Sequence, residues 1–356
     1  MSTPADLLMA IDLGTSGTKA GLFGLDGRRI AMATVEYAAA YAAPTWCEQD
    51  ADDWWAAAAA IGRVIEASGL PASRIASVIV SGQGPSCLPL DRHGKPLRPA
   101  IVWMDRRASA EADEILARVG AEAERASGNR VDGSFGGPKW LWFRDHEPER
   151  FAQTWKLVQA NGYVTFRLTG EIATDDSHAA ICAPFYDLEG RRWSADMLDA
   201  MGLDVELLPE IVPPTQVIGT VSSEAAVATG LVVGTPVVAG GGDAACAVLG
   251  AGVVEPGRFV QMLGTSGNIM GPVSRGLAVD TRLVNTVHLT GDGLISGTTY
   301  AGGVLQWFRD VVGPPEVATA NGRSAYELLD EAAADVPPGA AGLLMLPYLM
   351  GDRTPL

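Results

Sequence analysis

The 356-residue chain is long enough for two ordinary domains, and with 47% hydrophobic and 19% charged residues it has the composition of a globular protein. A formal net charge of −16 argues against a broad binding surface for nucleic acid or for an anionic membrane. The four cysteines are scattered without a CxxC pair, which argues against a structural zinc site or a disulfide framework and predicts reduced thiols in the cytoplasm.

In chain order, the apolar runs predict an alternation of strands and helices. Alternating or β-branched runs predict strands at 8–13, 19–23, 29–37, 75–80, 88–90, 100–103, 217–221, 236–239, 258–263, 283–289 and 293–296. Amphipathic and Ala-rich runs predict helices at 54–66, 109–119, 140–144, 155–168, 223–229, 244–249 and 303–311. Asp52 or Asp53 is expected to cap the first helix.

One small-residue turn occurs twice, each time after an apolar strand. The first copy is Gly14-Thr15-Ser16-Gly17 and the second is Gly264-Thr265-Ser266-Gly267. Glycine lets a ligand approach the backbone closely, and the hydroxyl groups add donors, so such turns suit a phosphate chain. One copy would indicate only a tight turn, whereas two copies predict two related lobes that clamp a nucleotide triphosphate.

Charged residues flank the first turn. Asp12, at the end of its strand, is placed to hold Mg²⁺, which prefers one or two carboxylates and keeps its waters. Lys19 is interpreted either as a phosphate contact or as a solvent-facing strand lysine. The predicted phosphate contacts are Gly14, Thr15, Ser16, Thr18, Lys19, Gly264, Thr265 and Ser266.

Asp243 is the most suggestive acid, because it follows three glycines that end a strand and stands at the start of a predicted helix. It could be an N-cap, which is a common role for aspartate. It could also be a general base, since a carboxyl group with an ordinary pKa of roughly 4 is charged at neutral pH. Accepting a proton from a substrate hydroxyl is a role worth about 10²–10⁴-fold in rate.

Other familiar motifs are absent. The only Gly-Lys pair, Gly94-Lys95, is followed by Pro96, which excludes a P-loop. The four histidines, His93, His146, His178 and His288, lack the spacing of metal ligands and are predicted to be ordinary surface or core residues.

Several motifs together resemble the FGGY family of carbohydrate kinases, with xylulokinases nearest and glycerol and erythritol kinases further off. The matching segments occur in the same order along nearly the whole chain, at 11–19, 46–50, 53–55, 98–107, 138–142, 240–243, 264–267 and 346–348. Such an ordered series is far more specific than any one motif.

The resemblance implies an α/β, two-lobed actin/hexokinase-like (ribonuclease H-like) fold, in which helices flank mixed sheets and the second lobe is incomplete. Residues 1–250 would form the sugar-binding lobe and residues 251–356 part of the nucleotide-binding lobe. ATP and Mg²⁺ are the implied cofactors, and a small-molecule sugar or polyol is the implied partner. No nucleic acid or membrane is expected, and a homodimer is left open.

The resemblance also assigns roles by position. Asp243 would be the catalytic base, Asp12 would serve the metal, and the two turns would bind the phosphates. The implied substrate contacts are Gln83, Gly84, Trp103, Asp105, Arg106 and Asp243, and the implied adenosine-side residues are Gly303 and Gln306. The alternatives are a core tryptophan at 103, a surface ion pair at 105–106 and an amphipathic core helix at 300–307.

Two departures from the family pattern limit the assignment of the sugar. Xylulokinases typically carry Gln-Met-His-Gly where this chain has Gln83-Gly84-Pro85-Ser86, and Ala244 stands where an Asn is common. Because a site built to pair hydroxyl groups discriminates strongly on such residues, a ketose or polyol is predicted rather than xylulose itself.

Family members also continue past the Leu-Pro-Tyr at 346–348, so we expect part of the nucleotide-binding lobe to be missing from this sequence. The predicted function is ATP-dependent phosphorylation of a sugar or polyol hydroxyl. A non-catalytic sugar- or nucleotide-binding regulator, an inactive fragment and an actin-like ATPase are the alternatives.

Overall fold

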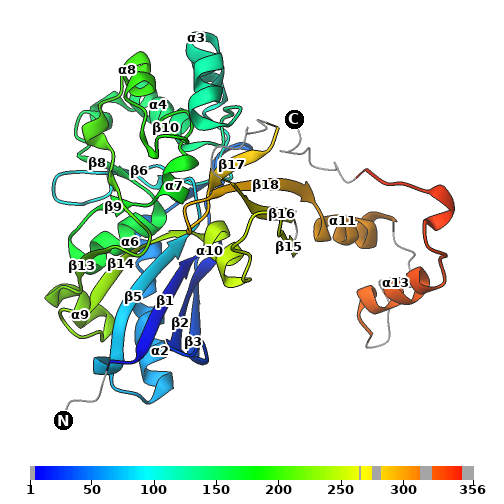
Figure 1. Ribbon diagram of the computed structural model, residues 1–356, viewed down its shortest axis with the longest axis horizontal. Helices are drawn as coiled ribbons and strands as arrows, with labels where there is room; N and C mark the ends of the chain where they lie inside the picture. Colours follow the sequence, from blue (N-terminus) through cyan, green and yellow to red (C-terminus); the bar gives the residue numbers. More distant parts are fainter. Residues whose placement is uncertain (1–4, 264–265, 275–281, 313–322, 347–356) are drawn as a thin grey trace.

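A six-stranded mixed sheet forms the part of the main body that lies toward the N-terminus (Figure 1). The structure is a computed structural model that describes residues 5–263, 266–274, 282–312 and 323–346. The strands of this first sheet are β1 (Leu7–Leu13), β2 (Gly17–Gly24), β3 (Arg29–Glu36), β5 (Ile75–Gly82), β13 (Val217–Thr220) and β14 (Pro236–Gly242). Their order is β13-β14-β5-β1-β2-β3, with β5 parallel to both β1 and β14 and the other pairs antiparallel. The predicted N-terminal hairpin and the buried strand after it are confirmed.

Helices α2 (Ala57–Ser68) and α6 (Ala160–Thr169) pack against the first sheet, and α9 (Ser223–Thr229) packs against these two helices. Their apolar residues join those of the strands in one core that includes Met9, Ile61 and Tyr163, each at most 1% exposed.

The predicted cap of the first helix is wrong. Asp50 caps a separate short helix, α1 (Ala51–Trp54), by accepting a hydrogen bond from the Asp52 amide, so Asp52 and Asp53 lie inside its first turn.

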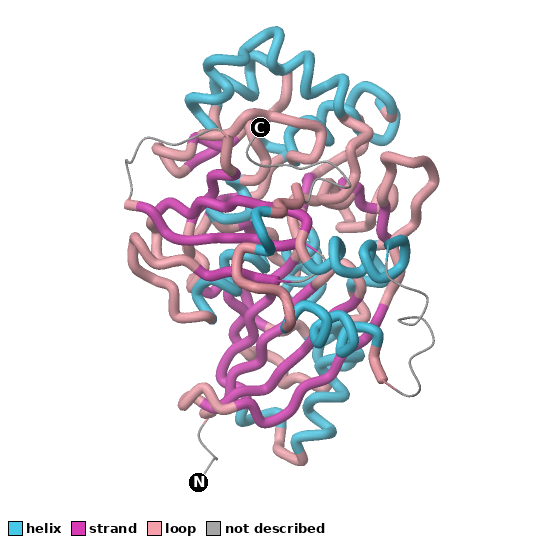
Figure 2. The backbone as a smooth tube through the Cα atoms, turned by 90° about the vertical axis from the view of Figure 1, so that its right-hand side faces the viewer, coloured by secondary structure: helices cyan, strands magenta, loops and turns pink. Residues whose placement is uncertain are grey.

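Smaller elements build a second core at the end of the molecule opposite the N-terminus, where α3 and α8 lie (Figures 1 and 2). The helices there are α3 (Ser109–Ser127), α4 (Gly136–His146), α5 (Pro148–Phe151) and α8 (Ala195–Met201). The short strands outside the two larger sheets are β4 (Glu48–Gln49), β6 (Leu88–Leu90), β7 (Ala100–Ile101), β8 (Lys156–Val158), β9 (Ala173–Thr174), β10 (Tyr186–Asp187), β11 (Arg192–Trp193) and β12 (Glu210–Ile211). The helix predicted at 155–168 is wrong in its first part, because residues 156–158 pair with β6 and bury Leu157 and Val158.

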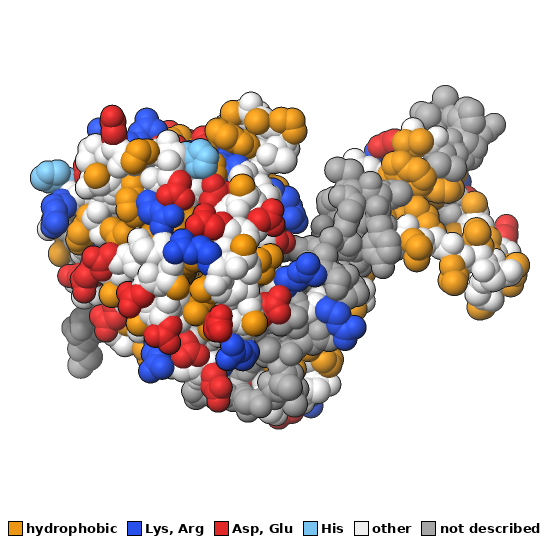
Figure 3. All heavy atoms as spheres, turned by 90° about the horizontal axis from the view of Figure 1, so that it is seen from above, with side chains coloured by type: hydrophobic (Ala, Val, Ile, Leu, Met, Phe, Trp, Pro, Cys, Tyr) orange, Lys and Arg blue, Asp and Glu red, His pale blue; other side chains and the backbone are white. Residues whose placement is uncertain are grey.

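A second sheet follows α10 (Asp243–Gly250). Its strands are β15 (Val260–Leu263), β16 (Ser266–Val273), β17 (Val284–Val287) and β18 (Gly293–Tyr300), in the all-antiparallel order β15-β16-β18-β17. After it come α11 (Gly302–Trp307), a π-helical turn at Phe308–Val312 and α13 (Ala325–Ala334). The helix α13 stands apart from the main body, on an arm whose visible surface carries many hydrophobic side chains (Figures 1 and 3).

The second sheet is joined to the rest of the protein through β17. The Asn285 amide donates to Asn129 Oδ1 at 2.8 Å, and Asn129 Nδ2 donates back to the Asn285 carbonyl at 2.8 Å. Val287 packs against Ala179 and Ala180 of the short helix α7 (Asp176–Ala180). Helix α7 therefore touches both sheets, since it also packs against β14.

The remaining short helical turns are Ala72–Arg74, Val205–Leu207 and Ala340–Gly342. No helix in the described part of the chain is long and apolar enough to cross a membrane.

Candidate active site

The carboxyl ends of three adjacent strands bring the main predicted residues together. Strands β1, β5 and β14 are mutually parallel, so they end at the same edge of the sheet. Asp12 is opposite Ser81, and Gly242 is opposite Gly82. Asp12 at this edge and Asp243 just beyond it are close enough to influence each other's charge. This edge is where open α/β sheets usually bind ligands.

Three side chains hold the first glycine-rich turn by donating hydrogen bonds to its carbonyl groups. The Gly14 carbonyl accepts hydrogen bonds from the Tyr37 hydroxyl at 2.6 Å and from Gln83 Nε2 at 3.2 Å. The Thr15 carbonyl accepts from Gln49 Nε2 at 2.6 Å. Burial raises the pKa of Tyr37 to about 12, so its hydroxyl remains a donor at neutral pH. We refer to Tyr37, Gln49 and Gln83 as the turn braces.

This bracing orients the backbone amides. In a trans peptide unit the carbonyl and the following N–H point in opposite directions. With the Gly14 and Thr15 carbonyls directed at the braces, the amides of Thr15 and Ser16 are directed away from them. Successive amides of this kind form a site for a phosphate oxygen.

Two predicted substrate contacts, Trp103 and Gln83, lie against the same turn. Trp103 is 37% exposed, which rules out a core role, and its Nε1 donates to Thr15 Oγ1 at 2.9 Å. Gln83 is 1% exposed, and its Oε1 has no partner among the residues that the structure describes. Gln83 Nε2 also donates to Gln49 Oε1 at 2.7 Å, so Gln83 braces the turn as well as pointing an open acceptor into the interior.

The prediction that Thr18 binds phosphate is wrong. Because β2 already begins at Gly17, Thr18 lies inside the sheet, and its side chain is fully buried. Lys19, the next residue, has an exposed side chain and sits opposite Asp12 on β1. Its charge attracts the Asp12 carboxylate and opposes the rise in the Asp12 pKa.

The prediction that Asp105 contacts a sugar is also wrong. Asp105 is completely buried, and both carboxylate oxygens accept hydrogen bonds from Arg107, with the Cys47 amide as a further donor at 2.5 Å. Arg106 is a surface residue that pairs with Asp132 at 3.6 Å, whereas Asp105 pairs with Arg107, so the alternative of a surface ion pair at 105–106 is wrong as well.

Asp243 is the first residue of α10, and its Oδ1 accepts a hydrogen bond from the Ala244 amide at 2.6 Å. The cap position itself is Gly242. Asp243 is exposed as a whole residue, but the protein packed around its carboxylate desolvates that group and raises its pKa to about 6. The negative charge of Asp12 adds to this rise, whereas the Ala244 amide and His178 oppose it. The pKa of roughly 4 expected from the sequence is therefore too low.

The two acids fit a divalent cation that is held mainly by phosphate oxygens. Desolvation raises the pKa of Asp12, and Asp12 and Asp243 repel each other, so their negative charge is only partly compensated. Among the described residues no group of three or more His, Cys, Asp or Glu side chains could hold a metal. Mg²⁺ bound to nucleotide phosphates requires only one or two carboxylates, and Asp12 can supply one.

Sequence reasoning missed a cluster next to these acids. Asp175, Ser177 and His178 are all at most 5% exposed and lie against the ends of β5 and β14. His178 was expected to be an ordinary surface or core histidine. Only the local polar sequence Asp175-Asp176-Ser177 marked the place, because the partners of this cluster come from distant segments.

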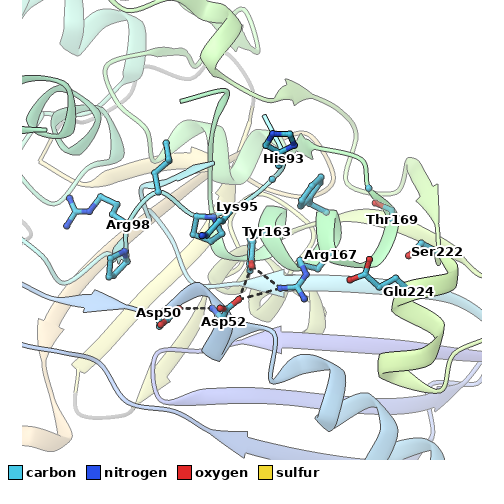
Figure 4. A pocket seen from close by; sticks show the side chains of 16 residues that line it. Asp50, Asp52, His93, Lys95, Arg98, Tyr163, Arg167, Thr169, Ser222 and Glu224 are labelled. Atoms are coloured by element: carbon cyan, nitrogen blue, oxygen red, sulfur yellow. Dashed lines mark hydrogen bonds and ion pairs between the residues drawn. The ribbon is translucent and has the colours of Figure 1, made fainter. Parts of the chain in front are cut away.

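A separate cavity of about 690 Å³ lies between the loop 93–99 and helix α6 (Figure 4). Its walls mix acidic and basic side chains, and Asp52 there lies 3.3 Å from the Tyr163 hydroxyl and 3.5 Å from Arg167. None of the predicted site residues lines it.

The second glycine-rich turn is only partly described. Gly264 and Thr265 lie outside the described residues, as do residues 347–356, and the side chain of Ser266 is not described. On the adenosine side, α11 has Gly303 buried and Gln306 exposed, and their role stays a prediction.

Comparisons with known proteins identify the same family that the sequence motifs resemble. Residues 7–250 match the model of the FGGY family of carbohydrate kinases, N-terminal domain. The chain is 32% identical over 355 residues to the xylulose kinase of Bacillus subtilis (strain 168), covering 98% of this chain and 69% of that protein. It is 34% identical over 357 residues to the xylulose kinase of Escherichia coli (strain K12), with 98% and 70% covered.

The crystal structure of xylulose kinase from Rhodospirillum rubrum superposes with a TM-score of 0.89 at 31% identity, covering 98% of this chain and 70% of that one. This likeness confirms the predicted actin/hexokinase-like α/β fold.

Proposed function

The chain belongs to the FGGY family of carbohydrate kinases, and we propose that it transfers the γ-phosphoryl group of ATP to a hydroxyl of a ketose or polyol. The observation that carries this proposal is the position of Asp243. Its carboxylate, which has an elevated pKa, lies just beyond the sheet edge at which the braced glycine-rich turn begins. A turn of this kind is suited to binding phosphate.

Asp243 is proposed as the general base. With a pKa of about 6 it is mostly ionised at neutral pH, yet it is a stronger base than an ordinary aspartate. The carboxylate would take the proton from the attacking hydroxyl as the oxygen bonds to the γ-phosphorus and the bond to the ADP oxygen breaks.

The amides of Thr15 and Ser16 are proposed to bind phosphate oxygens, and the second turn, with Gly264 and Thr265, would bind them from the other sheet. Asp12 would hold Mg²⁺, which when bound neutralises charge on the phosphates.

Residues 1–250 are proposed to bind the sugar and residues from 251 onward the nucleotide. The partly exposed ring of Trp103, whose Nε1 donates to Thr15, supports a sugar site beside the turn. At Gly84 a Cβ atom would come within 2.6 Å of Ile181 Cδ1 and 2.8 Å of Gln159 Oε1, so a larger residue there would have to displace the ends of these two side chains. Gly303 and Gln306 would lie on the adenosine side.

The test is an assay of ADP release over a panel of ketoses and polyols, on the unaltered protein and on Asp243→Ala. Sugar-dependent turnover that falls by about 10²–10⁴-fold in the variant, with the circular dichroism spectrum retained, is expected. Asp113→Asn, which alters an exposed acid on α3, is the matched control and should keep full activity.

Three other outcomes would overturn the proposal. ATP hydrolysis that does not depend on sugar would favour an actin-like ATPase. Binding of sugar or nucleotide without turnover on any member of the panel would favour a regulator. Full activity of Asp243→Ala would remove the base from the mechanism.

A further inference from the structure

Helix α7 connects the two strand ends that flank the proposed base. Asp175 caps this helix, accepting a hydrogen bond from the Ser177 amide at 2.7 Å and a second from the Ser177 hydroxyl. The Ser177 Oγ in turn accepts a hydrogen bond at 2.9 Å from the amide of Gly242, the residue before Asp243. One side of α7 is thereby fixed to the end of β14.

His178 fixes the other side. Its Nδ1 lies 2.7 Å from Asp175 Oδ1, and its Nε2 lies 3.1 Å from the carbonyl oxygen of Gly82 at the end of β5. Gly82 and Gly242 are directly opposite each other in the β5–β14 pairing. Ser177 and His178 are adjacent in α7, and each therefore bonds to one member of the Gly242–Gly82 pair that joins β14 and β5.

The two partners of the His178 ring define its protonation state. A carboxylate and a carbonyl oxygen can only accept hydrogen bonds, so both ring nitrogens have to donate, and a ring that donates twice is an imidazolium cation. His178 is completely buried, so water cannot supply the missing donor for a neutral ring. Burial alone lowers the pKa of His178, but the charge and hydrogen bond of Asp175 outweigh it and the net shift is upward.

The cation lies beside the proposed base. A Cβ atom built on Gly242 would be 3.9 Å from His178 Cε1, which places the ring against the backbone just before Asp243. The acids facing the ring are Asp175 from its own segment and Asp243 from α10. The nearby thiol of Cys182 has its pKa raised by burial and remains neutral.

We propose that His178 is a positioning residue of the kinase reaction. As a buried imidazolium it holds the Gly82 carbonyl while its neighbour Ser177 holds the Gly242 amide, which keeps Gln83 and Asp243 at a constant separation. Its positive charge also favours the ionised form of the Asp243 carboxylate. This inference rests on the proposed role of Asp243 as the base.

The first test needs no turnover. Nitrogen-15 NMR of the histidine rings, with His178→Gln to assign the signal, should show both nitrogens of His178 protonated at neutral pH. A neutral His178 ring in the folded protein would overturn the inference, whatever the activity.

The second test is kinetic. His178→Gln keeps a hydrogen-bond donor but loses the charge, and kcat should fall by up to about 10²-fold because the base is misplaced. KM for ATP should change less than kcat, since Tyr37 and Gln49 still hold the carbonyls of the turn. The acidic limb of kcat against pH should move to higher pH, which general loosening of the fold would not produce. His93→Gln, an exposed position, is the matched control.

Should His178→Gln fail to fold, Ser177→Ala and Ser177→Thr test the same device. The alanine variant loses the acceptor of the Gly242 amide and should lose kcat, whereas the threonine variant keeps the hydroxyl and should recover it. Unchanged kcat in both His178→Gln and Ser177→Ala would overturn the inference. If the unaltered protein phosphorylates no sugar, both the proposed function and the positioning role of His178 in the reaction fail. The NMR experiment tests the charge of the His178 ring independently of that outcome.

Discussion

The two sheets of this protein differ in how their apolar faces are covered. Strands of the first sheet alternate buried and partly exposed residues, and helices cover the buried side, where Met9 and Val78 are 0% exposed. In the second sheet large apolar side chains remain open, with Ile269 at 52% and Leu263 at 70% exposure. The proposed base and the braced turn thus lie on a fully packed scaffold, whereas the predicted nucleotide half has an uncovered face.

This difference separates a region in which buried side chains hold backbone groups from one in which apolar side chains are exposed. Side chains buried in the first region, such as Gln49 and His178, fix backbone groups at the strand edge through hydrogen bonds from distant segments. The arm beyond α11 instead exposes Leu343 and Leu344 at 78% and 90%. The following predictions test how far the two regions differ, from the largest effect to the smallest.

Truncating an isoleucine should affect the two regions very differently. Ile61→Ala removes a completely buried side chain from the first core and should lower the free energy of unfolding by about 2–5 kcal/mol. Ile269→Ala, on the exposed face of the second sheet, should change it by about 0.5 kcal/mol or less. Urea denaturation followed by circular dichroism measures both. Equal losses would mean that the second sheet is as well covered as the first.

The junction between the regions should contribute less than a core residue. Asn129 exchanges two buried hydrogen bonds with the backbone of Asn285, and Asn129→Ala leaves that N–H and that carbonyl oxygen unsatisfied, so we expect the free energy of unfolding to fall by about 1–3 kcal/mol. Asn285→Ala keeps both of these backbone bonds and loses only the side-chain Nδ2 donor to the carbonyls of Gly128 and Leu283, so it tests a separate contact. An unchanged free energy of unfolding in Asn129→Ala, measured by urea denaturation, would show that the contact does not join the two regions in solution.

Much of this architecture could be predicted from local sequence, but the partners of buried polar groups could not. The apolar strand before Asp12 and the glycine triplet before Asp243 are local signals, and both lie where they were expected. Asp105 seemed available to a sugar, yet its burial depends on Arg107 and on the distant Cys47. His178 looked isolated because its partner Gly82 is far away in the chain.

Some predicted element boundaries were wrong for the same reason. Residues 156–158 continue a helical pattern locally, but pairing with β6 makes them a strand. The pKa of Asp243 likewise depends on surroundings that the spacing of the motif does not contain, namely the desolvating protein around it and Asp12.

The pH dependence of the first region should show opposite signs for activity and stability. The pKa of Asp243 is about 6 when folded, above its ordinary value of 3.8. The base acts when deprotonated, so kcat should rise through about pH 6 and fall roughly tenfold one unit below it. The stability contributed by protonation of Asp243 is fully present below the ordinary pKa and is lost as pH rises through about 6.

Asp243→Asn should abolish both effects, because its amide does not titrate. The measurements are kcat against pH and the midpoint of thermal unfolding over the same range, for the unaltered protein and the variant. If the acidic limb of kcat lay near pH 4 instead, the carboxylate would be solvated like an ordinary surface aspartate.

The smallest effect should come from the single hydrogen bond between Trp103 and Thr15. Trp103→Phe keeps an aromatic ring but loses the Nε1 donor that reaches Thr15 Oγ1 at 2.9 Å, and Thr15→Val loses the acceptor. Because the bond is partly exposed, we expect about 0.5–1.5 kcal/mol, a rise of a few-fold in KM for ATP. KM for the sugar should change less in Trp103→Phe, since the ring face is retained.

A double variant distinguishes a direct bond from two independent effects. If the indole orients the turn through Thr15, the double variant should be no worse than either single one, because each change removes the same bond. Additive losses would show that Trp103 and Thr15 meet the substrates separately. The bond then would not link the sugar and phosphate sides of the first region, and only the buried turn braces would hold the turn in place.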